Sequence, residues 1–258
     1  MADTHPSETP SLLLLHGLGA TSGVWADLRA HLDWAGPVIA PDLPGHGPSP
    51  WTGDYTVGAL AAGVSGHCSN GEPVIAIGHS LGGAVALALA SGFFRPLVRA
   101  VVAIGVKVRW SDDDVAGMAG VAARGVRWFD TEAETVERFL RQAGLDGVAG
   151  PDHPAVVGAV TAEDGRWRVA QDPATFAQRP LDMGGLMAAA RCPVILGAGE
   201  HDALVSRADL AVQTDRPRIA PGRGHNVQVE DPAWVVGLLT EALDAADRRP
   251  AGSPRAAG

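Results

Sequence analysis

The pattern Gly78-His79-Ser80-Leu81-Gly82 could carry nucleophilic chemistry, because it places a serine inside a tight turn flanked by glycines. The apolar run at residues 73–77 predicts a short buried strand, and the Ala/Leu-rich run after the turn predicts a helix. Glycines at the two ends of the turn remove Cβ atoms that would crowd it. The start of a helix also places backbone N–H groups beside the hydroxyl. This context predicts that Ser80 is a nucleophile whose attack creates an oxyanion.

A serine hydroxyl reacts well only with a base beside it, and two later residues could supply one. A neutral imidazole must accept the serine proton, and a carboxylate must hold the tautomer of that imidazole. Asp202 follows an apolar run at residues 193–196, and His225 follows another at 218–220. Both runs predict strands, so both side chains are expected at the carboxyl edge of a parallel sheet, where such sheets bind ligands. The order along the chain predicts a triad of Ser80, Asp202 and His225.

The elements that must position these residues alternate between apolar runs and helical patterns. Strands are expected within residues 11–15, 37–40, 74–77, 97–105, 193–196 and 218–220, and helices within 25–32, 57–68 and 233–246. Continuous apolar runs are typical of strands that are buried on both faces. The alternation predicts a doubly wound α/β fold with a mostly parallel sheet of about six strands.

A long segment separates the fourth and fifth of these strands. Residues 107–188 exceed a βα connection and contain helical patterns at 112–124 and 131–143, followed by a polar stretch at 162–178. The segment is too rich in aromatic side chains for a solvated linker: Trp110, Trp128, Phe129, Phe139, Trp167 and Phe176. We therefore expect a core at 1–106 and 189–247, an inserted helical cap at 107–188 and a disordered tail at 248–258.

Composition excludes several classes of function. The net charge of −9 argues against a nucleic-acid partner, because phosphate binding needs a basic face. Cys68 and Cys192 have no ligand-like spacing and are expected to be small buried hydrophobic residues. The N-terminal residues contain no apolar run long enough for a signal peptide or a membrane span, so a cytoplasmic protein that acts on a small molecule is expected.

Five motifs resemble those of the α/β-hydrolase superfamily, within its cap-bearing branch with a serine nucleophile. They are His16-Gly17-Leu18-Gly19, Asp42-Leu43-Pro44-Gly45-His46-Gly47, Gly78-His79-Ser80-Leu81-Gly82-Gly83, Gly199-Glu200-His201-Asp202 and Gly224-His225. The resemblance covers residues 11–245. The cap resembles the family only in where it is inserted in the chain, because none of the five motifs lies within it.

The resemblance implies a role for each residue of the site. Ser80 is the nucleophile, His225 the general base and then acid, and Asp202 its orienting partner. The backbone N–H groups of Leu18 and Leu81 form the oxyanion hole. His16 is structural, and its side chain holds the loop that presents Leu18.

Other assignments of the same motifs remain open. Glu200 could replace Asp202 as the acid, although the family motif aligns the aspartate. His46 and His79 are interpreted as structural hydrogen-bonding residues. The histidines show no close metal-ligand spacing, so neither a metal nor another cofactor is expected.

One departure from the family concerns the edge of the sheet. Members usually begin with a two-strand hairpin before the strand that ends in the His-Gly motif, and only ten residues precede Ser11 here. The strand at 37–40 is then expected to be an exposed edge, which must be covered, charged or paired. We expect either a homodimer contact there or the N-terminal tail folded over it.

Together these residues predict acyl transfer to water in two steps, through an acyl-enzyme on Ser80. The aromatic cap predicts a mainly hydrophobic pocket for a small or medium ester, thioester or lactone, with Trp25, Trp110, Trp128 and Lys107 as candidate pocket residues. Relatives with the same triad leave two alternatives, a carbon–carbon bond hydrolase of diketone-type substrates and a non-enzymatic ligand receptor. Because the base must be neutral, activity is expected to fall as the pH drops below roughly 6 to 7.

Overall fold

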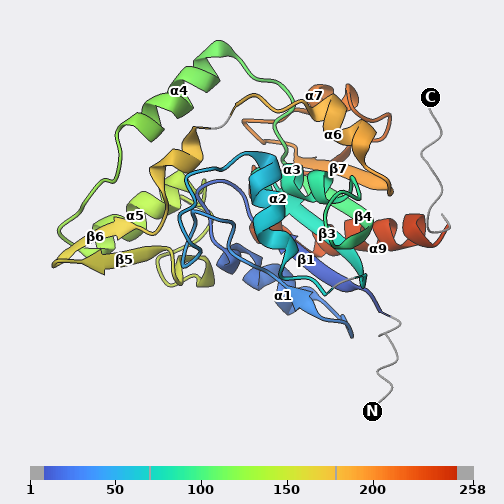
Figure 1. Cartoon of the computed structure of the whole chain (residues 1–258), viewed down its shortest axis with the longest axis horizontal. Helices are drawn as coiled ribbons and strands as arrows, with labels where there is room; N and C mark the ends of the chain where they lie inside the picture. Colours follow the sequence, from blue (N-terminus) through green and yellow to red (C-terminus); the bar gives the residue numbers. More distant parts are fainter. Residues whose placement is uncertain (1–8, 70, 178, 249–258) are drawn as a thin grey trace.

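A parallel sheet of six strands organises the chain in the computed structural model, which describes residues 9–69, 71–177 and 179–248 (Figure 1). Its strands are β1 (Ser11–Leu15), β2 (Val38–Ile39), β3 (Pro73–His79), β4 (Leu97–Ile104), β7 (Val194–Gly199) and β8 (Arg218–Ala220). They lie in the order β2-β1-β3-β4-β7-β8, and each neighbouring pair is parallel. The predicted α/β fold with a parallel sheet is confirmed.

Helices cover both faces of the sheet, because successive strand residues point to opposite sides and nearly all of them are apolar. Leu13 and Leu15 face the side covered by α2 (Val57–Ser65), α3 (Leu81–Leu89) and α6 (Met183–Ala189). Leu12 and Leu14 face the side covered by α1 (Ala26–His31) and α9 (Pro232–Asp247). Short helices α7 (Arg207–Ala211) and α8 (Val227–Glu230) complete the connections, and η1 (Ser22–Trp25) is a 3₁₀ turn at the start of the helix predicted within 25–32.

Much of the segment between β4 and β7, in which the sequence predicts a cap, lies to one side of the sheet in Figure 1. It comprises α4 (Asp112–Ala123), α5 (Glu132–Gln142), the strands β5 (Val160–Glu163) and β6 (Arg166–Val169), and 3₁₀ turns at Pro154–Val156 and Pro173–Phe176. The two helices match the helical patterns in the sequence. The antiparallel hairpin of β5 and β6 was not predicted; it lies after the two helices and overlaps the stretch that the sequence marks only as polar.

A local signal for this hairpin is present in the sequence. Asp164 and Gly165 join the two strands and both have a positive φ, at 50° and 76°. An Asp-Gly pair is a strong signal for a two-residue hairpin turn, because its residues tolerate that backbone conformation. The hairpin was not predicted because the stretch is polar and was not interpreted as strands.

The predicted boundary of the cap at residue 188 cuts through α6. Met183 and Met187 belong to the same buried cluster as α2 and α3, together with Cys68 and Cys192. Helix α6 therefore packs with the core rather than with the cap. Both cysteines lie in the core, as expected.

The two edges of the sheet are β2 and β8. In the described part of the chain no strand pairs with the outer side of β2, as the sequence predicted. Trp34 Nε1 donates a hydrogen bond to the carbonyl oxygen of Pro10 at 3.1 Å, which ties the start of β1 to the loop before β2. Most of the N-terminal tail that was expected as a cover (residues 1–8 of 1–10) and all but Arg248 of the predicted C-terminal tail lie outside the described residues. Over the described ranges, no helix is long and apolar enough to cross a membrane.

Candidate active site

Ser80 lies on a strained turn between β3 and α3. Its φ is 50° and its ψ is −116°, a conformation that non-glycine residues rarely adopt. A Cβ atom on Gly78 would collide with the carbonyl oxygen of Gly82, and one on Gly82 would collide with that of Leu15. The amide of Ser80 donates a hydrogen bond to the carbonyl oxygen of Ile104 at 2.7 Å. Strain persists at this position because the surrounding backbone holds it, as is common at functional sites.

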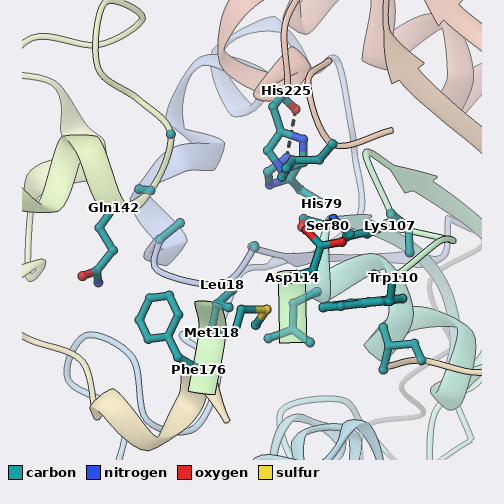
Figure 2. Close-up of a pocket in the computed structure, with 18 of the residues that line it drawn as sticks. Leu18, His79, Ser80, Lys107, Trp110, Asp114, Met118, Gln142, Phe176 and His225 are labelled. Atoms are coloured by element: carbon teal, nitrogen blue, oxygen red, sulfur yellow. Dashed lines mark hydrogen bonds and ion pairs between the residues drawn. The ribbon is translucent and has the colours of Figure 1, made fainter. Parts of the chain in front are cut away.

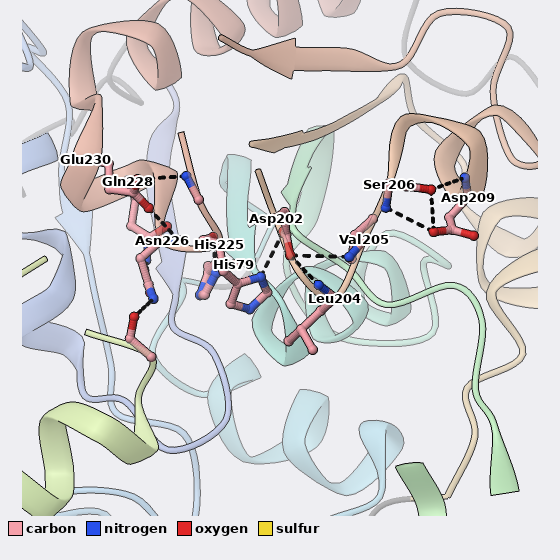
Figure 3. Close-up of polar contacts among 12 residues, drawn as sticks. His79, Asp202, Leu204, Val205, Ser206, Asp209, His225, Asn226, Gln228 and Glu230 are labelled. Carbon is pink, nitrogen blue, oxygen red and sulfur yellow. Dashed lines mark hydrogen bonds and ion pairs between the residues drawn. The ribbon is translucent and has the colours of Figure 1, made fainter. Parts of the chain in front are cut away.

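His225 and Asp202 form a hydrogen-bonded pair at the carboxyl edge of the sheet (Figure 3). Nδ1 of His225 lies 2.8 Å from Oδ2 of Asp202, whose side chain is fully buried. The other carboxylate oxygen accepts hydrogen bonds from the amides of Leu204 at 2.8 Å and Val205 at 3.2 Å. Gly105 leaves room for the pair, because a Cβ there would lie 3.1 Å from the imidazole. In the neutral imidazole, Nδ1 then carries the proton and Nε2 is left to accept one.

His79, beside the serine, supports the loop that carries His225. Nε2 of His79 lies 3.0 Å from the carbonyl oxygen of His225, and the two ring centroids are 4.6 Å apart. Since a carbonyl can only accept, Nε2 of His79 carries its proton. Burial away from water holds the pKa of His79 well below its ordinary value, so this ring stays neutral. The predicted structural role of His79 agrees with this contact.

His16 supports the loop on the other side of the serine. It is fully buried, its Nδ1 lies 2.8 Å from the carbonyl oxygen of Gly17, and its Nε2 accepts from the amide of Leu43 at 2.9 Å. Burial lowers the pKa of His16 to about 4. A neutral His16 therefore joins the first loop of the core to the loop that follows β2.

The two residues whose backbone amides are predicted to form an oxyanion hole line the same cavity as Ser80. Leu18 and Leu81 both line that cavity, and Leu81 is the first residue of α3. Within the described ranges neither amide donates a hydrogen bond to the protein. The amide of Leu81 lies in the first turn of α3, where the helix dipole favours negative charge.

A cavity of about 330 Å³ lies over Ser80 (Figure 2). Most of its wall is apolar, and Ser80 and His225 both line it. Lys107 and Trp110 line it as predicted, but the ammonium group of Lys107 is not a free charge there. It forms an ion pair with Asp114 at 2.8 Å, and that hydrogen bond lowers the pKa of the Asp114 carboxyl to about 2.

The other two predicted pocket residues lie elsewhere, which corrects the prediction. Trp25 is fully buried in the hydrophobic core on the α1 and α9 side of the sheet. The ring of Trp128 packs within the cap against the guanidinium groups of Arg166, at 5.0 Å, and Arg168, at 5.9 Å. Neither tryptophan lines the cavity over Ser80. A tryptophan's apolar surface suits a core, a cap or a pocket equally well, so residue type did not distinguish them.

Sequence reasoning missed the cap residues that do line this cavity. They are Asp114, Met118, Arg141, Gln142, Ala143, Gly144, Phe176 and Leu181. Asp114 and Met118 lie one turn apart on α4, so their spacing places them on one face of the helix. That spacing was the available signal, but it does not say which face meets the core.

The remaining acidic and metal alternatives find no support in the geometry. Oε2 of Glu200 accepts a hydrogen bond from the amide of Gly222 at 2.8 Å, whereas Asp202 is the residue that contacts His225. Over residues 9–69, 71–177 and 179–248, no group of three or more His, Cys, Asp or Glu side chains could hold a metal ion.

Comparisons with known proteins give relatives of the same fold. A model described as "Alpha/beta hydrolase family" matches residues 12–238. The chain is 40% identical over 145 residues to the magnesium-chelatase 30 kDa subunit of Rhodobacter capsulatus, a match that covers 53% of this chain and 49% of that protein. It is 30% identical over 206 residues to a pimeloyl-[acyl-carrier protein] methyl ester esterase of Neisseria meningitidis, over 77% of each chain. The solved structure of E-2-(acetamidomethylene)succinate hydrolase has a TM-score of 0.77 and 25% identity, over 93% of each chain.

Proposed function

Since this chain belongs to the alpha/beta hydrolase family, we propose that it is a serine hydrolase with an acyl-enzyme on Ser80. Its substrate is a small or medium, mainly hydrophobic carboxylic ester, thioester or lactone. The observation that carries the proposal is the strained Ser80 at one cavity with the hydrogen-bonded pair of His225 and Asp202. Among these substrates the esters are favoured, because the relative aligned over 77% of the chain is a methyl ester esterase.

The first step forms the acyl-enzyme. Oγ of Ser80 attacks the carbonyl carbon while Nε2 of His225 accepts the serine proton, and Asp202 stabilises the resulting imidazolium. The carbonyl oxygen becomes an oxyanion and accepts hydrogen bonds from the amides of Leu18 and Leu81. One such donor contributes about 3 kcal/mol to transition-state stabilisation in enzymes of this type. The tetrahedral intermediate then collapses, and the imidazolium gives its proton to the departing alcohol or thiol.

The second step releases the acid. Water attacks the acyl carbon while His225 accepts a proton from it, and a second oxyanion forms in the same place. Collapse breaks the bond to Oγ, and His225 returns the proton to Ser80. The imidazole of His225 therefore carries one proton from Ser80 to the departing alcohol or thiol and a second from water back to Ser80. No cofactor takes part in the proposed cycle.

Labelling and turnover test this proposal together. A fluorophosphonate probe is expected to label Ser80, and p-nitrophenyl esters are expected to be hydrolysed. Ser80→Ala should abolish labelling and lower kcat by at least about 10⁴-fold. Ser91→Ala is a matched control, because that hydroxyl does not line the cavity over Ser80: it donates to the carbonyl oxygen of Ala88, at 2.6 Å, and accepts from the amide of Phe93, at 3.3 Å.

The outcomes separate the proposal from its alternatives. Unchanged turnover in Ser80→Ala, or no labelling of the wild type, would remove the catalytic role of Ser80. A panel that adds lactones and vinylogous diketones separates ester hydrolysis from carbon–carbon bond hydrolysis. Tight binding of a ligand without any turnover would indicate a receptor.

A further inference from the structure

Arginine side chains of the cap surround a second, smaller cavity. Arg124, Arg127 and Arg138 line this cavity, whose volume is about 130 Å³. Gln142 and Phe176 line it too, and both also line the cavity over Ser80. In Figure 2 these two residues lie on the side of the cavity over Ser80 that is away from Lys107 and Trp110. This second cavity, the cap cavity, therefore adjoins the cavity over Ser80 on the side away from Lys107 and Trp110.

Among the described residues, no carboxylate pairs with the arginines of the cap cavity. In the described part of the chain, none of Arg124, Arg127 and Arg138 forms an ion pair with a carboxylate. Arg141, on the same helix as Arg138, is paired with Glu137 at 3.6 Å. The guanidinium of Arg127 lies 4.8 Å from the ring centroid of Phe129. Three positive charges thus lie together in a chain whose net charge is −9.

The approach of these like charges is electrostatically unfavourable. Arg138 is half-buried, and that burial and the like charges of Arg127, Arg141 and Arg124 lower its pKa. Repulsion between like charges is relieved when an anion binds among them, and a cleft lined by one sign of charge concentrates ions of the other. Guanidinium groups suit carboxylates and phosphates in particular, because their parallel N–H donors match two oxygens.

The wall between the two cavities is held by a buried polar network. The amide of Gln142 donates to the side-chain carbonyl of Gln171, which is 5% exposed. The amide of Gln171 in turn donates to Nε2 of His46 at 3.2 Å and to the hydroxyl of Thr175 at 2.6 Å. Burial lowers the pKa of His46 to about 3, so its Nε2 remains an acceptor. The position of Gln142 is therefore determined by contacts that reach the core.

We propose that the cap cavity binds an anionic group, a carboxylate or a phosphate, at the far end of a substrate whose ester carbonyl lies at Ser80. This inference rests on the proposed ester hydrolysis and narrows its substrate class. The apolar middle of such a substrate contacts Phe176 as it passes from one cavity to the other. The ammonium of Lys107 does not compete for the anion, because Asp114 neutralises it.

Matched substrates test the inference. p-Nitrophenyl half-esters of dicarboxylic acids are compared with p-nitrophenyl alkanoates of equal length, and a third series ends in a phosphonate. The wild type should prefer one anionic series by at least about 10-fold in kcat/KM. The preferred series distinguishes carboxylate from phosphate. High salt should reduce the preference, because Arg124 and Arg127 are exposed and salt screens exposed charges.

Substitutions then assign the preference to the cap cavity. In Arg138→Gln the ratio of kcat/KM, anionic over neutral, should fall by at least about 10-fold. Arg138→Lys keeps the charge without the two parallel donors and should give an intermediate ratio. Arg29→Gln, an exposed arginine on α1, is the matched control and should keep the wild-type ratio. A wild type with no anionic preference, or equal ratios in wild type and Arg138→Gln, would overturn the inference.

Binding separates this inference from the proposed function. Calorimetry on Ser80→Ala measures affinity for the methyl half-esters and for methyl alkanoates without turnover. Tighter binding of the half-esters that is lost in the Ser80→Ala/Arg138→Gln double variant supports the subsite, even if no ester is hydrolysed by the wild type. Ester turnover by the wild type together with equal affinities for both probes overturns the subsite and leaves the proposed function standing.

Discussion

Histidine side chains near the cavity over Ser80 fall into two groups, and burial separates them. His16, His46 and His79 are at most 3% exposed, and burial lowers the pKa of each. Each has a backbone or side-chain partner that suits a neutral ring. His225 keeps 18% of its side chain exposed and contacts the carboxylate of Asp202. The first three rings support loops, whereas the fourth is partly exposed and lines the cavity over Ser80.

The buried histidines predict a loss of stability in acid. The pKa of His16 is about 4 and that of His46 about 3 in the folded chain, against an ordinary value of 6.5. The unfolded chain therefore takes up protons that the folded chain does not. The contribution of the neutral rings to the free energy of unfolding should be fully present above about pH 6.5. The free energy of unfolding should fall as the pH drops from there toward about 4, by up to about 1.4 kcal/mol per pH unit for each ring.

Urea unfolding across this pH range measures the effect. His46→Gln should reduce the slope of the unfolding free energy against pH, whereas His67→Gln, at an exposed position, should leave it unchanged. A free energy of unfolding that does not change over the same range would contradict the neutral assignment.

At the scale of elements, α4 differs from every helix that packs on the sheet. Its capping box between Ser111 and Asp114 accounts for where it begins, but none of its residues is buried. Figure 1 shows it standing away from the sheet, and two of its residues, Asp114 and Met118, line the cavity over Ser80. The ion pair of Asp114 with Lys107 ties its first turn to the segment after β4. A helix with so little buried surface opens at low free energy.

Removing that tie should loosen α4 without unfolding the protein. Lys107→Met keeps the capping box and should speed cleavage within residues 108–125 several-fold by a protease that does not require basic residues. The change in Tm should be small, because a half-exposed ion pair contributes about 1 kcal/mol or less. Arg141→Met is the control, since it breaks an ion pair within a single helix. Wild-type cleavage rates in Lys107→Met would show that α4 is held by other contacts.

At the scale of the molecule, the two edges of the sheet are unlike. At β8, Arg218 pairs with Glu241 of α9, with Nε donating to the carboxylate at 2.9 Å. At β2, the half-buried Val38 and Ile39 bring no charge to the edge. Charged side chains protect an edge strand from pairing with another chain, and uncharged edges are open to it. The β2 edge is therefore the surface on which self-association or a covering segment is expected.

Light scattering and amide exchange test the expected cover on β2. A dimer, or a monomer in which the amides of residues 38–40 are protected on the outer side of the strand, would support it. A monomer at every concentration whose outer β2 amides exchange freely would contradict it. The β8 edge provides the internal comparison, because its charges should prevent pairing in either case.

Local patterns in the sequence were enough to predict the sheet, the turn that carries Ser80 and the order of the loops that meet at the carboxyl edge of the sheet. An apolar run predicts a buried strand wherever it occurs, and the glycines beside Ser80 are required by the turn itself. Asp202 and His225 could be placed because parallel strands all end at the same edge. Each of these inferences depends on neighbouring residues or on a general rule of topology.

Only the tertiary structure decided which side chains face the cavities. Trp25 and Trp110 are the same residue type, yet one is in the core and the other is in the pocket wall. Arg124 and Arg138 lie on different sides of the loop between α4 and α5, and their approach depends on how those helices pack. The physical reason is that residue type sets how much surface a side chain can bury, whereas contacts between distant segments set against what it is buried.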